Sequence, residues 1–351
     1  MRYIPTSRLE PGMALGHDIY DGAGRLLLAK HLLLTSEYIS NLEFLGFAGI
    51  YIDDEFTSGI EIQQVLSPQV KSQALRVVHD LFAFDDTQED LPVEEVKVRA
   101  TVEQVVEEIL CNGDVMCNMM DIKNFDDYIY YHSINVGMLS VMIGSRYGLN
   151  QKQLNLLATA GLLHDVGKRF IDMEIICGTW PLTGEARETW KNHPHYGVDY
   201  LKKHFDFPAL VYTGILEHHE WYNGSGYPYG KSGDEIPLFA RIIKLADCYD
   251  ALISKRPSRD AQTPSDALEY LMAGTGSEFD PQLVEIFTRK LAVYPQGCEV
   301  ELSDGRRGVV AKNFENFPLR PLIKLFDTGE LLNLRDDQDS RHITVGRVLV
   351  R

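Results

Sequence analysis

Hydrophobic residues recur at three- and four-residue intervals along most of the chain between residues 93 and about 291. This spacing places them on one face of a helix. In one such segment Leu154, Leu157 and Gly161 share a face, and His164 takes the next position on it, where a leucine is usual. The pattern predicts a mainly α protein whose largest domain is all helical.

The N-terminal segment follows a different pattern. Short β-prone stretches at His17–Tyr20 and Gly24–Leu28 alternate with turns, and a helical pattern follows at Ser36–Leu45. Stretches of this kind, bounded by turn residues, predict strands. We expect residues 1–60 to form a small α+β module.

Residues 61–98 are predicted to form a helical and acidic linker. Ser67–Phe84 has helical spacing, and the acidic, polar run Asp85–Asp90 that follows is typical of a linker or an exposed loop. We place the main helical domain, residues 99–294, directly after this boundary.

Beyond Pro295 the chain alternates as strands do. Asp304–Gly305 is typical of a hairpin turn, and it lies between the strand-like stretches Cys298–Leu302 and Gly308–Ala311. We expect residues 295–351 to form a small β-rich extension.

Composition narrows the classes of protein that fit. A chain of 351 residues exceeds one typical domain of roughly 150 residues. Its 44% hydrophobic and 24% charged content is ordinary for a soluble globular protein, and no apolar run is long enough to span a bilayer. The N-terminus has no apolar signal core. We therefore expect neither membrane insertion nor export.

Charge and cysteine usage add two expectations. The net charge of −17 argues against binding of polymeric nucleic acid, which is held through neutralised phosphates. A small anionic substrate stays compatible if metal ions and a few local cations supply positive charge. The five cysteines are odd in number and lack Cys-x-x-Cys spacing, which favours a reducing, cytoplasmic location.

The pair His164–Asp165 ends an apolar helical run. An imidazole and a carboxylate in apolar surroundings are costly unless a partner satisfies them, and a metal ion satisfies both. Adjacent helical residues point about 100° apart, so two consecutive ligands fit best at a helix end. Gly167 is interpreted as the residue that stops the helix.

Other candidate ligands occupy similar positions. His132 is the polar member of an apolar stripe, and taken alone it is more typical of a core histidine bonded to a carbonyl. Histidines at such positions recur, however, and seven of the eleven histidines fall between His132 and His219 inclusive. Further candidates follow or lie within apolar helical segments, namely His193, His218, His219 and Asp247.

Imidazoles and carboxylates from several segments, without thiolates, are typical of a site for two first-row ions such as iron or manganese. A structural zinc site would bring closely spaced cysteines. Two ions can hold a bridging hydroxide and clamp the oxygens of a phosphoryl transfer. Asp165 is the expected bridge. Lys168 is expected to reach a phosphate oxygen or the leaving group, and its alternative role is a solvated cation at a helix end.

The segment Trp221–Pro228 is rich in turn-forming residues and follows two candidate ligands directly. It is either an ordinary loop or a nucleotide-binding one. In the second case its glycines, Gly226 among them, allow close backbone approach, and Tyr222 or Tyr227 stacks a base. Glu220 is a candidate for orienting an imidazole by a hydrogen bond to the ring nitrogen that does not bind the metal.

These motifs occur in a specific order. HDVGK stands at residues 164–168 and HPHYG at 193–197, and the order continues with HHEWYNGSGYP at 218–228, ADCYDAL at 246–252 and KRPSR at 255–259. Over about residues 100–290 the sequence resembles the HD-GYP family of bacterial phosphodiesterases, a subclass of the HD hydrolase superfamily. The resemblance implies a helical domain with two or three metal ions. Such domains hydrolyse the second messenger cyclic di-GMP, or in some members cyclic GMP-AMP, to the linear dinucleotide and often to mononucleotides.

The resemblance also assigns roles residue by residue. Asp165 would bridge the ions, and Lys168 matches the lysine of the family's HD-x-GK string. Arg256 and Arg259 match basic positions that hold substrate phosphate, with plain surface exposure as the alternative. The metal ligands would be His132, His164, Asp165, His193, His218, His219 and Asp247.

Four positions qualify the match. Tyr128 stands where some relatives carry a glutamate that recruits a third metal, which favours a binuclear site here. Ser258 stands where many members have a tyrosine. His195 is a spare candidate ligand, although the family pattern assigns the role to His193, and His204 is expected on a helix surface.

The leading hypothesis is thus a metal-dependent cyclic dinucleotide phosphodiesterase. One alternative is a catalytically silent sensor of cyclic dinucleotides, and another is a hydrolase of mononucleotides. The complete ligand set favours the enzyme, and the GSGYP loop disfavours the mononucleotide hydrolase. The N-terminal module resembles an accessory module often found ahead of this domain, and the end modules are candidates for contacts with a second copy or with signalling proteins.

Overall fold

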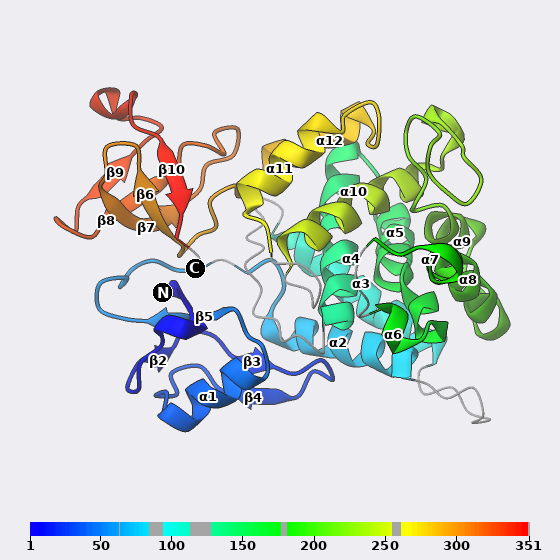
Figure 1. Ribbon diagram of the computed structural model, residues 1–351, viewed down its shortest axis with the longest axis horizontal. Coiled ribbons are helices and arrows are strands. Elements are labelled where there is room, and N and C mark those ends of the chain that lie inside the picture. The colour runs from blue at the N-terminus through cyan, green and yellow to red at the C-terminus, as the bar shows by residue number, and fades with distance from the viewer. Residues whose placement is uncertain (63, 84–93, 113–127, 177–180, 255–260, 350–351) are drawn as a thin grey trace.

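The structure, a computed structural model, describes residues 1–62, 64–83, 94–112, 128–176, 181–254 and 261–349 (Figure 1). A helical domain fills one half of the molecule, and the two β-containing end modules lie side by side in the other half. The predicted fold class, mainly α with small modules at both ends, is confirmed. Among the described residues no helix combines the length and the apolar character that crossing a membrane requires.

The helical domain is built around α4 (Tyr128–Tyr147) and α5 (Gln151–Leu163). The two helices meet at Gly137 and Gly161, where a Cβ on Gly161 would lie 2.9 Å from the Cα of Gly137. The other helices are α2 (Pro68–Ala83), α3 (Glu95–Cys111), α6 (Met173–Ile176), α7 (Gly184–Lys191), α8 (His193–His204), α9 (Ala209–Leu216), α10 (Leu238–Ile253), α11 (Pro264–Ala273) and α12 (Pro281–Lys290).

Helix α2 belongs to the helical domain rather than to an exposed linker. Leu75 and Leu81 are fully buried, and they join the same hydrophobic core as Val106 of α3 and Leu139 of α4. Burial of this apolar face outweighs the acidic character of the segment that follows it. The prediction of a linker over residues 61–98 is therefore corrected for α2, and residues 84–93 lie outside the described part of the chain. The other domain boundaries stay predictions.

The N-terminal module holds a three-stranded antiparallel sheet, a two-stranded hairpin and one α-helix, each in the region expected from the sequence. The helix, α1 (Ser36–Phe44), is capped by Thr35, whose side chain accepts a hydrogen bond from the Tyr38 backbone N–H. The sheet has the order β1 (Arg2–Pro5), β5 (Gly49–Asp53), β2 (Ala14–Leu15), and the hairpin pairs β3 (Ile19–Tyr20) with β4 (Leu26–Leu28).

The C-terminal module is a five-stranded antiparallel sheet, so the expected β-rich extension is confirmed. The predicted hairpin turn carries Gly305 at φ +85°. Arg2 of the N-terminal module pairs with Glu299 of this module at 2.8 Å, so the two ends of the chain are tied together. The sheet order is β10 (Val345–Val348), β6 (Glu299–Leu302), β7 (Arg307–Lys312), β8 (Leu322–Leu325), β9 (Leu331–Asn333).

Candidate metal centre

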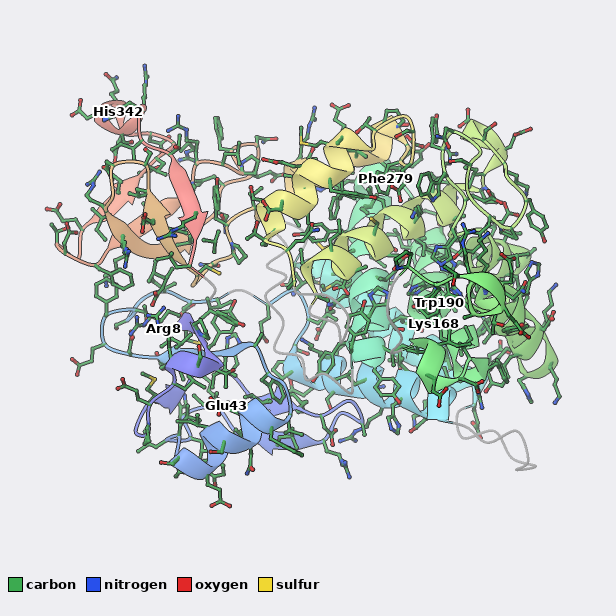
Figure 2. The ribbon with its side chains drawn as sticks, in the orientation of Figure 1. Arg8, Glu43, Lys168, Trp190, Phe279 and His342 are labelled. Carbon is green, nitrogen blue, oxygen red and sulfur yellow. The ribbon has the colours of Figure 1, made fainter. Side chains whose placement is uncertain are left out.

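The seven predicted metal ligands lie close together in the helical domain, in the region that the labels of Lys168 and Trp190 mark in Figure 2. Helix α4 supplies His132 and helix α10 supplies Asp247, while the others lie at helix ends. Local sequence explains these ends. Asn150 and Gln153 form a capping box that starts α5, and Pro194 stands in the first turn of α8, where a missing N–H costs nothing. The end positions are held by His164 and Asp165 after α5, His193 at the start of α8, and His218 and His219 after α9.

The turn after α5 needs Gly167 for a reason other than the predicted one. Helix α5 already ends at Leu163, with His164 as its cap, and the 3-10 helix η2 (Val166–Phe170) follows. A Cβ on Gly167 would lie 1.8 Å from the carbonyl oxygen of His193. Gly167 therefore does not stop the helix, and its missing side chain lets η2 approach α8 and its metal ligand.

We expect Gly167→Ala to destabilise the protein by about 2 kcal/mol or more, because the new methyl group meets backbone that cannot yield freely. Urea unfolding measures this free energy. Gly346→Ala is the control, since its Cβ would meet no atom closer than 3.3 Å. Equal unfolding midpoints for the two variants would show that η2 and α8 do not need this close approach.

Six of the seven ligands divide into two groups of three. In each group the potential ligand atoms all lie within 4.8 Å of one another. We call the first group the α4 triad, which consists of His132, His164 and Asp247, and the second group the α9 triad, which consists of His193, His218 and His219.

Asp165 lies between the triads and turns one oxygen toward each. Its Oδ2 is 3.6 Å from Nε2 of His132 and 3.3 Å from Nε2 of His164. Its Oδ1 is 3.2 Å from Nε2 of His193 and 4.0 Å from Nε2 of His218. A carboxylate in this position is suited to bridge two cations.

Hydrogen bonds fix the direction of three imidazoles. In each, Nδ1 donates to the carbonyl three residues earlier, so Nε2 carries the lone pair and faces the centre. The bonds run from His164 to Gly161 at 2.8 Å, from His193 to Trp190 at 2.6 Å, and from His218 to Ile215 at 2.6 Å.

The atoms that face the centre are buried and have no hydrogen-bond partner. They are the Nε2 atoms of His132, His164, His193, His218 and His219, together with Oδ1 of Asp165. Leaving this many buried polar atoms unsatisfied is costly. Cations between the two triads would satisfy them, so the donor set fits first-row metal ions.

Burial and neighbouring charges shift the pKa values of these groups toward the forms that bind cations. Burial lowers the pKa of each imidazole in the α9 triad. Burial would raise the pKa of Asp165, but electrostatic interactions with His164 and Lys168 hold this pKa well below its usual value. The α9 triad is thus neutral and Asp165 ionised near pH 7, which are the forms that bind metals.

Sequence reasoning missed two residues that hold His132 in place. Nδ1 of His132 lies 2.7 Å from Oδ2 of Asp250, and Asn135 donates to Oδ1 of the same carboxylate at 2.7 Å. Burial would lower the pKa of His132, but the nearby carboxylates of Asp247 and Asp250 raise it. The signal in the sequence was the three-residue spacing of Asp247 and Asp250, which puts both on one face of α10.

We expect Asp250→Ala to weaken metal binding at the α4 triad by roughly 10- to 100-fold, since outer partners of ligating histidines have effects of this size. Titration with Mn²⁺ followed by metal analysis measures it. Asp199→Ala, at an exposed position on α8, is the control. Unchanged affinity in Asp250→Ala would show that His132 needs no such support.

Lys168 is nearly buried and forms an ion pair with Asp165. Its ammonium also lies 4.7 Å from the centroid of the Trp190 ring, a contact that sequence reasoning did not foresee. Contact with a substrate phosphate stays a prediction for Lys168. Its ion pair with Asp165 places the Lys168 ammonium beside the two triads.

Glu220 does not orient an imidazole, so that prediction is wrong. Its carboxylate accepts hydrogen bonds from the backbone N–H groups of Tyr229 at 2.6 Å, Gly230 at 3.1 Å and Lys231 at 3.1 Å. Glu220 therefore holds its own loop together. Three backbone N–H donors satisfy a buried carboxylate better than one imidazole would.

The loop is packed against the ligands. A Cβ on Gly226 would lie 2.2 Å from the backbone nitrogen of Trp221, so close packing accounts for this glycine. The ring of Tyr227 stacks on His219, with centroids 4.7 Å apart and planes 23° apart. One face of Tyr227 is therefore taken, and stacking of a base on Tyr222 or on the other face of Tyr227 stays a prediction.

The remaining candidates lie away from the triads or outside the description. His195 and His204 belong to neither metal-ligand group, and the ring of His195 lies 6.2 Å from that of Tyr229. The ring of Tyr128 stacks on His132 at 5.2 Å. Arg256, Ser258 and Arg259 lie outside the described residues, so their roles stay predictions.

Comparison with known proteins identifies the family of this chain. The family model described as HD domain matches residues 104–283, just over half of the chain. A Pseudomonas aeruginosa protein named Cyclic di-GMP phosphodiesterase PA4108 is 30% identical over 243 residues, which are 69% of this chain and 58% of that protein. A Vibrio cholerae protein named 3'3'-cGAMP-specific phosphodiesterase 2 is 35% identical over 156 residues, 44% of this chain and 30% of that protein.

A solved structure agrees in fold. Bd1817, a HDG"Y"P protein from Bdellovibrio bacteriovorus, has a TM-score of 0.54 and 20% identity, with 81% of this chain and 97% of that chain covered. The chain spans less than two thirds of each of the two relatives named above. With its HD and GYP motifs around one buried centre, the chain belongs to the HD-domain family, in the HD-GYP branch.

Proposed function

We propose that this protein is a metal-dependent phosphodiesterase that hydrolyses a cyclic dinucleotide. Cyclic di-GMP is the first candidate substrate and cyclic GMP-AMP the second, because relatives named for each are similar to this chain. Water adds across one P–O ester bond, which opens the ring to a linear dinucleotide. Further cleavage to mononucleotides is part of the proposal.

The observation that carries the proposal is the set of buried, unpartnered nitrogen and oxygen atoms that face one another across the two triads. Two divalent cations, when bound, supply Lewis-acid chemistry that lowers the pKa of water and stabilises charge on phosphate oxygens. Iron and manganese suit this mixture of imidazole and carboxylate ligands.

Residues of this chain would hold the cations and supply positive charge to the substrate phosphate. The α4 triad and the α9 triad would each hold one cation, and Asp165 would offer one oxygen to each of them. Lys168 forms an ion pair with Asp165 and is the proposed source of positive charge for a phosphate oxygen or for the leaving group. Local cations matter because the chain carries a net charge of −17 and its substrate is an anion. Arg256 and Arg259 are the further candidates for this role.

A silent cyclic dinucleotide sensor is the second candidate function. It would need the binding loop but not a complete set of metal ligands. This chain keeps all seven, with five imidazoles aimed inward, and this favours the enzyme.

The experiment is an assay of the purified full chain loaded with Mn²⁺ or Fe²⁺, with products separated by chromatography. We expect a linear dinucleotide from cyclic di-GMP or from cyclic GMP-AMP, and none from GTP run in parallel. Tight binding of either cyclic dinucleotide without turnover would establish the sensor instead. Hydrolysis of GTP alone would overturn both.

A further inference from the structure

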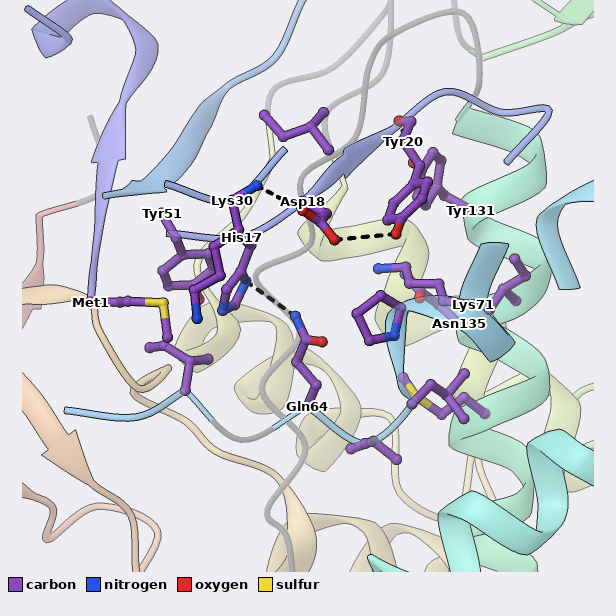
Figure 3. Close-up of a pocket in the computed structure, with 17 residues that line it drawn as sticks. Met1, His17, Asp18, Tyr20, Lys30, Tyr51, Gln64, Lys71, Tyr131 and Asn135 are labelled. Atoms are coloured by element: carbon purple, nitrogen blue, oxygen red, sulfur yellow. Dashed lines mark hydrogen bonds between the residues drawn. The ribbon is translucent and has the colours of Figure 1, made fainter. Parts of the chain in front are cut away.

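A cavity whose lining includes none of the predicted metal ligands lies between the N-terminal module and helices α2 and α4 (Figure 3). Its volume is about 330 Å³, within the usual range for small-ligand sites. We propose that this cavity is a regulatory site for a small organic phosphate of nucleoside monophosphate type, and that its occupation weakens the α4 triad. The regulatory part rests on the proposed function, whereas the binding part does not.

The cavity has a positive character. Lys30 lines it from the N-terminal module and Lys71 from α2, and both are drawn at its edge in Figure 3. Asp18 is the one acidic residue among the described residues that line it, and its Oδ1 already accepts a hydrogen bond from the Lys30 backbone N–H at 2.7 Å. In a chain of net charge −17, a lining whose described residues include two lysines and one carboxylate is suited to an anion.

The pKa of His17 reflects the same positive charges. Burial, followed by the charges of Lys30, Lys71 and the N-terminal ammonium, lowers its pKa to about 4. A neutral His17 holds a hydrogen bond with the Gln64 amide at 3.1 Å. These two polar groups face a cavity whose other walls include Ile62, Val65, Leu66, Ile134 and Met138.

The lining matches the parts of a nucleoside monophosphate. The lysines suit the phosphate, His17 and Gln64 suit the hydrogen-bonding edge of a base, and the apolar side chains suit its flat surface. Mononucleotides are also the end products of the proposed reaction. Binding here would therefore let product concentration act on the enzyme.

A short chain of hydrogen bonds joins the cavity to the metal centre. Asn135 lines the cavity, and its Nδ2 donates to Asp250 at 2.7 Å. The other oxygen of Asp250 holds Nδ1 of His132 at 2.7 Å. One side chain thus touches both the cavity and the carboxylate that orients a metal ligand.

This chain of hydrogen bonds predicts that a ligand in the cavity weakens metal binding at the α4 triad. An anion in the cavity competes with Asp250 for the Nδ2–H of Asn135. When Asn135 turns to the ligand, Asp250 loses a donor and holds His132 less firmly. Tyr131, which also lines the cavity, donates its hydroxyl to the carbonyl of Tyr20 at 2.8 Å, so movement of the N-terminal module acts on the same turn of α4.

Binding is tested first, by equilibrium dialysis of radiolabelled GMP against the full chain, with guanosine and inorganic phosphate as competitors. The host is the Asp165→Ala variant, in which the proposed metal centre is broken, so that binding at that centre does not interfere. We expect GMP to bind, and its Kd to rise about tenfold or more in Lys30→Glu and in Lys71→Glu, since a charge-assisted bond is lost. Lys152→Glu, at an exposed position on α5, should leave the Kd unchanged. Absence of lysine-dependent binding would overturn the site, whether or not the protein is a phosphodiesterase.

Coupling is tested on the chain with Asp165 intact, by measuring Mn²⁺ affinity with and without GMP. We expect GMP to weaken Mn²⁺ binding by about 5-fold or more, as is usual for coupled sites. In Asn135→Ala, GMP should still bind but should no longer change Mn²⁺ affinity. GMP binding that leaves Mn²⁺ affinity unchanged in the unmodified chain would overturn the coupling.

Discussion

Replacing Asp165 by alanine is expected to release at least one metal ion per chain and to abolish phosphodiesterase activity. The two oxygens of Asp165 face different triads, so a single substitution removes a ligand from both proposed cation positions. It also leaves the buried Lys168 ammonium without its partner. We expect the loss of turnover to exceed the roughly 10- to 100-fold effect of removing an outer partner such as Asp250. Metal analysis and a turnover assay on the same sample measure both effects.

Asp199→Ala is the matched control, because Asp199 is an exposed carboxylate on α8, the helix that begins with His193. It should keep its metal content and its activity. An Asp165→Ala protein that retains two ions and full turnover would mean that Asp165 is not the bridge.

Removal of metal by a chelator is expected to stop turnover and to lower the melting temperature by several degrees. Without cations, five buried imidazole nitrogens and a carboxylate oxygen lack partners at the centre of the helical domain. A cation present at 100 times its Kd stabilises the folded state by about 2.7 kcal/mol, and the chelator removes this contribution. Thermal unfolding with and without EDTA measures the shift, and added Mn²⁺ or Fe²⁺ should reverse it.

The Asp165→Ala variant separates this effect from unspecific action of the chelator. Because its metal centre is already broken, EDTA should shift its melting temperature little. An equal shift in both proteins would place the stabilising ion elsewhere in the molecule.

Much of the metal centre could be predicted from sequence because its ligands break a strong local pattern. His132 and His164 take positions on buried helix faces that usually hold apolar residues, and this is visible without coordinates. The structure brings His132 of α4 to the consecutive pair His164–Asp165 at the end of α5. The fold class was equally predictable, since long helical spacing and short alternating stretches each leave a clear signal.

The supporting contacts could not be predicted in the same way. His132 and Asp250 are 118 residues apart, and no local pattern says that one orients the other. The role of Gly167 depends on how closely η2 passes α8, which is a property of packing rather than of spacing. Glu220 has a charge suited to orient an imidazole, but the backbone N–H groups of its own loop reach it instead.

The place of α2 shows the same limit. The acidic run after it suggested a linker, yet Leu75 and Leu81 face the core of the helical domain. The cavity beside Lys71 exists because α2 and the N-terminal module meet there, and contacts between modules leave little trace in local spacing.

The central claim is that two cations sit on either side of Asp165, and anomalous diffraction from crystals of the Mn²⁺-loaded protein tests it most directly. We expect two peaks, one bounded by His132, His164 and Asp247 and the other by His193, His218 and His219, with a carboxylate oxygen of Asp165 toward each. A single peak away from Asp165, or two peaks that leave one triad without an ion, would contradict it.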